Sequence, residues 1–170
     1  MKVDLTGKVA VVTGGGGILC SVMAEALAKS GAKVAILDLR EENAKKVADK
    51  INAEGGKAIG LAANVLELES LQKANEIIKA ELGICDILIN GAGGNNPKAT
   101  TDKEYFEPGD IDAETKSFFD LDTEGVGFVF NLNFLGTLIP TQAFAKQMVG
   151  REGCNIINIS SMNAYTPLTK

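Results

Sequence analysis

An apolar run followed by glycines decides the fold of this chain: Lys8–Thr13 reads KVAVVT, and Thr13–Cys20 reads TGGGGILC. The β-branched run predicts a buried strand, because strands of a parallel sheet are covered on both faces and lose polar-apolar alternation. Apolar residues at helical spacing follow from Ile18 to Ser30 and predict a helix. The apolar stripe of this helix is expected to be Val22, Met23, Ala26 and Leu27.

The same strand-then-helix pattern repeats along the chain. Strands are predicted at Lys33–Asp38, Lys57–Ala62, Asp86–Asn90 and Asn155–Ser160, and helices at Glu41–Ala53, Glu67–Leu82 and about Thr123–Val149, the last with a kink at Pro140. Alternating strands and helices imply right-handed βαβ units. We therefore expect an α/β, Rossmann-type doubly wound parallel sheet with strand order 3-2-1-4-5. Residues 1–170 would form a single domain, with residues 94–122 an irregular insertion near the active site.

Composition excludes several functional classes. The chain has 170 residues, no histidine and a formal charge of −5. The absence of histidine excludes a Ser-His-Asp triad and a His-ligated zinc site within it, and the acidic balance argues against a nucleic-acid partner. No apolar run is long enough to span a membrane, and no signal peptide is visible. Cys20, Cys85 and Cys154 are expected to be core or near-core thiols, with no metal site, in a cytoplasmic protein.

The glycine turn and Asp38 together indicate a dinucleotide site. A glycine-rich turn between a strand and a helix lets an anion approach the free N–H groups at the helix start. Asp38 ends the second strand, where a ribose-binding carboxylate falls in a dinucleotide fold. A carboxylate there accepts bonds from both ribose hydroxyls and repels a 2′-phosphate, which favours NAD over NADP. The alternatives are a flexible turn and a strand-end aspartate, and Arg40 could soften the discrimination against NADP.

Several motifs in order resemble the short-chain dehydrogenase/reductase family. Three motifs resemble the cofactor-binding segments: the glycine turn with Gly14, Gly16, Gly17, Ile18 and Leu19; Asn64-Val65, which resembles the Asp-Val that meets adenine; and Asn90-Gly91-Ala92-Gly93, which resembles Asn-Asn-Ala-Gly. Two further residues resemble catalytic ones. Asn133 is similar to the mid-helix catalytic asparagine, and Ser161 to the catalytic serine of the fifth strand. The resemblance implies that these residues bind NAD and contribute to catalysis. Asn133 could instead be a polar residue bonded to the backbone, and Ser161 a turn cap.

The chain departs from the family pattern in four places. Ile18 and Cys20 stand where the last two glycines of the turn are usual, so Gly17 is expected to supply the close approach one residue early. Asn64 replaces an aspartate, and the second asparagine after the fourth strand is Gly91. The family's Tyr-x-x-x-Lys would begin about four residues past Lys170. We therefore expect the sequence to be the N-terminal part of a longer chain.

The amino-acid sequences of the turn and of residues 90–101 resemble those of the D-mannonate oxidoreductase (fructuronate reductase) group of the family, which is related to gluconate 5-dehydrogenases. That resemblance implies reversible hydride transfer between NAD(H) and a sugar-acid ketone or secondary alcohol. Lys98, with Asn95 and Asn96, follows the fourth strand near the crevice where such sheets bind ligands. We expect Lys98 to pair with the substrate carboxylate; the alternative is a solvated loop lysine.

Other functions remain open at this point. The chain could act on gluconate, another polyol or a 3-oxoacyl thioester, or it could be a non-catalytic NAD-binding module. In the resembling family the helix predicted from Thr123 packs subunits into dimers and tetramers. Phe128, Phe130, Phe134, Leu138 and Phe144 exceed what one sheet face needs, so a homo-oligomer is expected.

Overall fold

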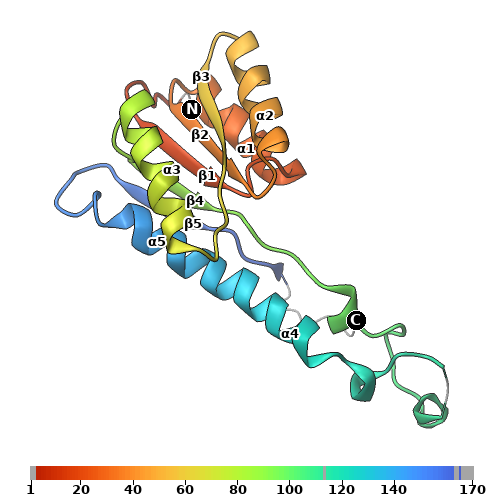
Figure 1. Cartoon of the computed structure of the whole chain (residues 1–170). Coiled ribbons are helices and arrows are strands. Elements are labelled where there is room, and N and C mark those ends of the chain that lie inside the picture. The colour runs from red at the N-terminus through yellow and green to blue at the C-terminus, as the bar shows by residue number, and fades with distance from the viewer. Residues whose placement is uncertain (1–2, 113, 163–164, 166–170) are drawn as a thin grey trace.

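The computed structural model describes residues 3–112, 114–162 and 165. The strands are β1 (Val9–Thr13), β2 (Lys33–Asp38), β3 (Lys57–Ala62), β4 (Ile87–Asn90) and β5 (Asn155–Asn158). The helices are α1 (Ile18–Lys29), α2 (Glu41–Ala53), α3 (Leu68–Glu81), α4 (Thr123–Phe130) and α5 (Gly136–Ala145), and a π-helical segment, Asn131–Leu135, joins the last two (Figure 1).

The five strands form one parallel sheet in the order β3-β2-β1-β4-β5, as predicted. In the central pair, Val11 is the register partner of Leu88, and Thr13 is the partner of Asn90. The last residues of β1 and β4 therefore lie side by side, and the turns that follow them meet at the carboxyl edge of the sheet. This is the edge at which open α/β sheets bind ligands.

Each face of the sheet is covered by helices. On one face, Ala10 and Val12 of β1 pack in a buried cluster with residues of α1 and α2; on the other, Val9 and Val11 pack with residues of α3 and α5 (Figure 1). All four of these strand residues are almost fully buried. The predicted inner face of α2, Ala44, Val47, Ala48 and Ile51, is buried as well. Burial on both faces is why the strand sequences lack alternation.

The predicted stripe of α1 is wrong in part. Val22 and Ala26 are exposed, while Cys20 and Ala24 are buried and Met23 and Leu27 pack against them. The buried line starts at Cys20 and has helical spacing, so the helix is turned relative to the prediction. Small residues at Cys20 and Ala24 let α1 approach the sheet closely, and a pattern based on large apolar residues missed them.

The last long helix also differs from the prediction. It departs from α geometry at Asn131–Leu135, whereas Pro140 lies inside the continuous α5. Phe144 is fully buried against the sheet and is not part of the outer face of this helix, unlike Phe130 and Phe134, which are about 70% exposed. A π-helical segment breaks the four-residue hydrogen-bond pattern without proline, and such segments are frequent at functional sites.

The three cysteines are free, with Cys20 and Cys85 buried and Cys154 partly buried. Burial raises the pKa of Cys85 to about 12, so this thiol stays neutral at pH 7. Within the described ranges, no helix combines the length and apolar character needed to cross a membrane.

Candidate functional site

A cavity of about 630 Å³ opens at the carboxyl edge of the sheet. Ligand pockets commonly fall between about 300 and 1,000 Å³, so this cavity has the size of a cofactor site. Its wall is built from four segments: the turn after β1, the end of β2, the turn after β3, and the turn after β4, with one contribution from the last long helix. The lining residues are Gly14, Gly17, Ile18, Leu19, Cys20, Asp38, Leu39, Ala63, Asn64, Val65, Leu66, Gly91, Ala92, Gly93, Phe128 and Leu132.

The glycine turn is fixed by close contacts. Gly14 has φ +62°, and a Cβ on it would lie 2.9 Å from the Cα of Ala92. A Cβ on Gly16 would lie 2.8 Å from Oδ2 of Asp38. Both positions therefore require glycine, because a side chain would collide with neighbouring loops. Gly17 has more space and forms the N-cap of α1.

The N-terminus of α1 is open to an anion. Gly17 gives it no side-chain cap, and its first turn contains no acidic residue. The first N–H groups of a helix have no partner within the helix, and the helix dipole places partial positive charge there. Ile18 and Leu19 are 88% and 69% exposed at this point, although both are apolar. Exposed apolar side chains beside open N–H groups are typical of a wall that a ligand covers.

Asp38 lies next to the glycine turn. Its Oδ2 accepts a hydrogen bond from the N–H of Gly16 at 3.2 Å, and its Oδ1 accepts one from the N–H of Arg40 at 3.0 Å. A carboxylate has about four lone-pair positions, so two N–H groups leave capacity for further donors. The carboxylate can therefore accept bonds from vicinal hydroxyls of a bound sugar.

Thr13 joins the turn after β1 to the turn after β4. Its Oγ1 accepts hydrogen bonds from the N–H of Gly91 at 3.1 Å and from that of Ala92 at 3.2 Å. Thr13 is fully buried, which strengthens these bonds relative to bonds in water. The two turns that face each other across the cavity are therefore held in one arrangement.

Cys20 and Gly91 form a second link between these turns. The Cys20 thiol lies 3.7 Å from the carbonyl oxygen of Gly91, and a Cβ on Gly91 would be only 2.2 Å from the Cys20 sulfur. Burial and the charge of Asp38 raise the pKa of Cys20, so it remains a protonated thiol that can donate. The two departures from the family pattern, a cysteine for glycine and a glycine for asparagine, thus occupy one shared space.

Asn64 and Val65 lie in the turn after β3 and form part of the cavity wall. The Asn64 side chain accepts a hydrogen bond from the N–H of Leu66 at 3.0 Å and donates one to Glu67 at 2.8 Å. These bonds fix the turn after β3. The arrangement brings Asn64, Val65 and the glycine turn to the same cavity.

Asn133 holds the turn after β4 from the opposite side. Its Oδ1 accepts from the N–H of Gly94 at 3.1 Å, and its Nδ2 donates to the carbonyl oxygens of Gly94 and Val129, both at 2.8 Å. Asn133 lies within the π-helical segment, where α-helical hydrogen bonding is interrupted. The side chain thus clamps Gly94, one residue after the lining residue Gly93.

Asn90 is buried at the end of β4. Its Nδ2 donates to Oγ1 of Thr141 at 2.9 Å and to Oδ1 of Asn158 at 2.8 Å. These bonds tie β4 to α5 and to β5. Asn90 therefore stabilises the cavity floor, and its side chain does not line the cavity.

The remaining predicted residues lie outside the cavity wall. Ser161 is exposed after β5. Lys98 packs against Gly125 of α4, and its Nζ is 3.9 Å from Oδ2 of Asp122. Asn96 accepts from the N–H of Lys98, and Asn95 donates to Thr100. Asn133 is eight positions after Gly125, about 12 Å along an α-helix, so Lys98 lies away from the turn that Asn133 holds.

Six lining residues were not predicted as site residues: Cys20, Leu39, Ala63, Leu66, Phe128 and Leu132. Leu39 is 73% exposed immediately after Asp38, and Phe128 is 45% exposed on α4. Leu39 could have been predicted from the sequence as part of the site, because it directly follows the strand-end Asp38. Phe128 was predicted to face another subunit and Leu132 only to be part of a helix, whereas the structure places both at the cavity.

The cavity fits a dinucleotide. Open helix N–H groups suit a pyrophosphate, Asp38 suits a ribose with free hydroxyls, and Leu39 and Val65 offer apolar surface for a flat base.

Comparison with known proteins gives consistent matches. Residues 8–170 match the short chain dehydrogenase family. The chain is 58% identical over 167 residues to an uncharacterised oxidoreductase of Haemophilus influenzae, covering 98% of this chain and 58% of that protein. It is 48% identical over 167 residues to the uncharacterised oxidoreductase UxuB of Bacillus subtilis, covering 98% of this chain and 59% of that protein.

A solved structure is similar throughout. The crystal structure of a proposed D-mannonate oxidoreductase from Haemophilus influenzae with bound NAD superposes with a TM-score of 0.95 and 57% identity, covering 99% of this chain and 60% of that one. The chain thus spans less than two thirds of the length of each of these relatives.

The shared space of Cys20 and Gly91 generates a prediction. Gly91→Asn should weaken NADH binding at least tenfold and lower the melting temperature, because the new side chain would overlap the Cys20 sulfur; overpacking costs about 1–3 kcal/mol. Adding Cys20→Gly should recover most of the affinity. Isothermal titration calorimetry and thermal denaturation of the two single variants and the double variant measure this coupling.

Cys20→Gly alone is the matched control, because it removes the thiol without adding volume. Additive effects in the double variant would show that the two residues do not share one space.

Proposed function

This chain belongs to the short-chain dehydrogenase family, and we propose that it forms the cofactor-binding part of an NAD-dependent oxidoreductase. The observation that carries the proposal is the pairing of an uncapped helix N-terminus with Asp38 across one glycine turn. Gly14, Gly16, Gly17, Ile18 and Leu19 would hold the pyrophosphate. Asp38 would bind the adenosine ribose, and its charge would disfavour a 2′-phosphate.

The adenine and nicotinamide ends have separate proposed contacts. Asn64 and Val65 would meet the adenine, and the turn Asn90-Gly91-Ala92-Gly93 would support the inner part of the cofactor. When bound, NAD supplies the hydride acceptor, or NADH the donor. The turn positions are restrained by Thr13 and Asn133, so the protein would offer a preorganised surface.

Ser161 and Asn133 are the proposed catalytic residues of this chain. Ser161 would donate a hydrogen bond to the substrate oxygen, on which negative charge develops during reduction of a ketone; such a donor contributes about 3–4 kcal/mol. Asn133 would hold a water that links the proton-transfer groups to solvent. No Tyr-x-x-x-Lys occurs in residues 1–170, since Gly109 stands four residues after Tyr105 and Thr169 four residues after Tyr165. The proposal therefore places the cofactor and oxyanion groups within residues 1–170.

The proposed substrate is a sugar acid, with D-fructuronate/D-mannonate as the first candidate. The relative from Haemophilus influenzae with bound NAD supports this choice through its own description. Asn95, Asn96 and Lys98 would contact the substrate, and Lys98 would exchange Asp122 for the substrate carboxylate. Gluconate or a 3-oxoacyl thioester is the alternative substrate, and a non-catalytic NAD-binding module is the alternative role.

We also propose a cytoplasmic homo-oligomer, a dimer or a tetramer, that acts in carbohydrate metabolism. Three free cysteines favour a reducing compartment. The outer face of the last long helix carries Phe130, Phe134 and Leu138, all at least 41% exposed, which favours burial against another subunit.

Cofactor choice tests the central proposal. Asp38→Asn should raise the dissociation constant for NADH by roughly 10- to 100-fold, because a hydrogen bond to a charged group contributes about 1.5–3 kcal/mol. The same variant should bind NADPH more tightly than the parent does, since the charge facing the 2′-phosphate is lost. Calorimetric titration with both cofactors measures the two changes.

Asp4→Asn is the control, because it removes one carboxylate charge at an exposed position away from the cavity. Equal NADH affinity in the parent and in Asp38→Asn, or no NADH binding to the parent, would overturn the assignment.

The substrate proposal has its own test. In the active enzyme, Lys98→Ala should raise KM for fructuronate far more than KM for an uncharged ketone, because only fructuronate offers a carboxylate. Steady-state kinetics with both substrates measures the ratio. Equal effects on both would remove Lys98 from substrate recognition.

The oligomer proposal is tested by light scattering at micromolar concentration, where we expect a mass of at least two chains. Phe134→Ser should shift the protein toward a monomer, because it places a hydroxyl at the centre of the outer apolar face. Val22→Ser, at an exposed apolar position on α1, should leave the mass unchanged. A monomeric parent protein would contradict the proposal.

A further inference from the structure

Residues 97–122 form an arm at the far end of α4, away from the sheet (Figure 1). The described residues of the arm contain three short 3-10 helices and neither an α-helix nor a strand. Its two ends are joined where the N–H of Asp122 donates to the carbonyl oxygen of Lys98 at 3.1 Å. The arm thus leaves and re-enters the domain at one point, beside the first turn of α4.

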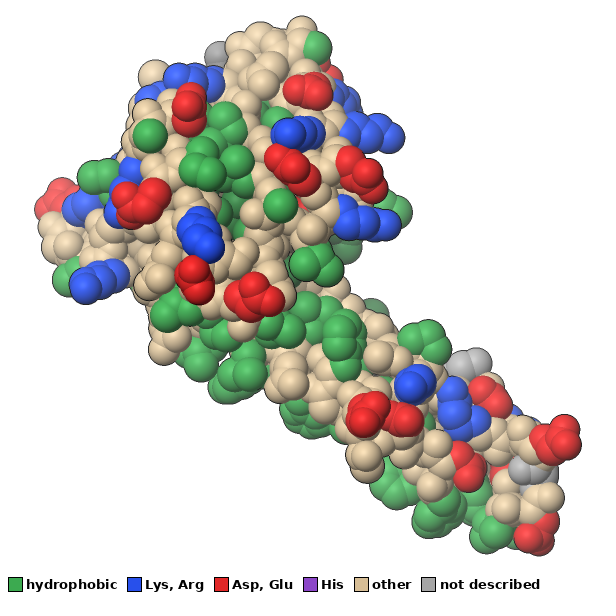
Figure 2. Space-filling view, in the orientation of Figure 1, with side chains coloured by type: hydrophobic (Ala, Val, Ile, Leu, Met, Phe, Trp, Pro, Cys, Tyr) green, Lys and Arg blue, Asp and Glu red, His purple; other side chains and the backbone are tan. Residues whose placement is uncertain are grey.

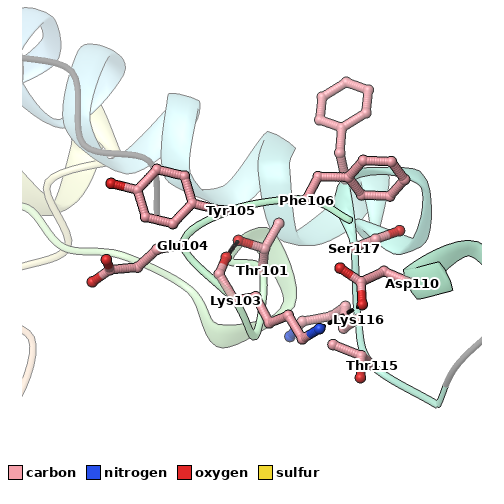
Figure 3. A pocket seen from close by; sticks show the side chains of 10 residues that line it. Thr101, Lys103, Glu104, Tyr105, Phe106, Asp110, Thr115, Lys116 and Ser117 are labelled. Atoms are coloured by element: carbon pink, nitrogen blue, oxygen red, sulfur yellow. Dashed lines mark hydrogen bonds and ion pairs between the residues drawn. The ribbon is translucent and has the colours of Figure 1, made fainter. Parts of the chain in front are cut away.

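The arm has an ordered interior. Asp110 is 5% exposed, and its Oδ1 lies 2.6 Å from Nζ of Lys103, which lowers the pKa of Asp110 and raises that of Lys103 (Figure 3). The N–H of Asp102 donates to the carbonyl oxygen of Lys116 at 2.9 Å. Ser117 and Asp120 form a capping box. These bonds hold the arm in a defined shape without help from the sheet.

The arm nevertheless displays large apolar side chains to solvent. The ring of Phe119 contacts the rings of Phe106 and Phe118 edge to face, with centroids 5.8 and 5.7 Å apart. Phe118 and Phe119 are 71% and 72% exposed, and so is Tyr105, at 72%. Figure 2 shows hydrophobic side chains along the same side of the molecule from α5 through α4 to the end of the arm. An ordered segment with exposed aromatic residues is typical of a contact surface.

The arm also carries the net charge of the chain. It contains eight acidic residues and three lysines, a formal charge of −5, which equals the formal charge of all 170 residues. Basic and acidic residues elsewhere therefore cancel. Among the described residues, Glu104, Asp112 and Glu114 of the arm are exposed and have no hydrogen bond or ion pair. A partner surface for the arm should therefore be apolar with at least one free cation.

The end of α5 has this chemistry. Gly136, Pro140 and Phe144 of α5 are buried, as is Met148 just after it, each four residues after the last. On the opposite side the exposed positions also recur every four residues: Phe130, Phe134, Leu138, Gln142 and Lys146. This outer row is apolar near α4 and ends in a cation. Lys146 has no ion pair among the described residues, and the nearby Val149 is 82% exposed.

We propose that the arm docks on the α5 end of a second copy of this chain, across a two-fold axis near Phe134. The inference rests on the homo-oligomer proposed above and identifies its second contact. In an antiparallel pair, Phe130 of one copy lies level with Leu138 of the other. Lys146 is 12 residues, about 18 Å, beyond Phe134, so it lies level with position 122 of the other copy, at the root of its arm. A two-fold interface needs such self-complementarity.

Charge favours the antiparallel arrangement over the parallel one. A parallel pair would place two arms of charge −5 side by side. In the antiparallel pair, each arm root lies about 18 Å from the axis on opposite sides, so the two roots are roughly 36 Å apart. This separation exceeds the Debye length of about 8 Å at physiological salt, so repulsion between the arms is screened.

Docking of the arm would also act on the cofactor cavity. Only Asn95 and Asn96 separate the arm from Gly94, which Asn133 clamps through two hydrogen bonds. Gly93, the residue before Gly94, lines the cavity. A partner that fixes the arm would therefore restrain the turn after β4.

Photo-crosslinking of mixed chains tests the arm contact. One chain carries p-benzoylphenylalanine in place of Phe119 and is labelled with ¹⁵N; the other is unlabelled, carries no probe and is in excess. After irradiation and digestion, mass spectrometry should find labelled arm peptides joined to unlabelled peptides from residues 138–151. Cross-links confined to labelled chains, or to other regions of the unlabelled chain, would overturn the proposal.

A charge reversal gives an independent measurement. Lys146→Glu should raise the dimer dissociation constant about tenfold in sedimentation equilibrium at low salt, and the difference should shrink at 0.5 M NaCl. Lys57→Glu is the matched control, because Lys57 is exposed on β3 and has no ion pair among the described residues. Equal effects of the two reversals would count against the arm contact.

The outcomes separate the two proposals. A dimer that forms through α4 and α5 without arm cross-links overturns only the arm contact. A monomer overturns both the oligomer and the arm contact, while NADH binding to either form tests the cofactor proposal alone.

Discussion

The hydroxyl of Thr13 is the interaction on which the candidate site depends. Thr13 ends the central strand β1, and its hydroxyl accepts hydrogen bonds from the N–H groups of Gly91 and Ala92 in the turn after β4. Without it, two partly buried backbone donors would lose their partner, and an unsatisfied buried donor costs about 1–3 kcal/mol. The cavity lies between these two turns, so its shape follows from this one side chain and from the parallel register that sets Thr13 beside Asn90.

Much of the fold could be predicted because strands that are buried on both faces of the sheet have a simple sequence pattern. The strands read as short β-branched runs, and α2 reads as an amphipathic helix whose inner residues are all buried. The stripe of α1 could not be read in this way. There the contact with the sheet is made by Cys20 and Ala24, and small residues signal close approach only once the neighbouring strand is known.

The site shows the same division between local and non-local information. Asp38 and the glycine turn lie in one βαβ unit, so their proximity follows from a local motif, and the structure joins them by a hydrogen bond from Gly16. The relation of Cys20 to Gly91 spans 71 residues and could not be read from either position alone. Each looked like a separate departure from the family pattern. In the structure the two positions adjoin, because a Cβ on Gly91 would collide with the Cys20 sulfur.

The arm shows how a long insertion can be accommodated without change to the sheet. The entropy cost of closing a loop rises only with the logarithm of its length, so 26 residues cost little more than a short connection once the ends are fixed. Here the ends are fixed by the bond between Asp122 and Lys98 and by the contact of Lys98 with Gly125, which has no side chain to displace it. The insertion therefore adds a charged, aromatic surface at the end of α4, while the strands and the glycine turn keep the geometry that the cavity requires.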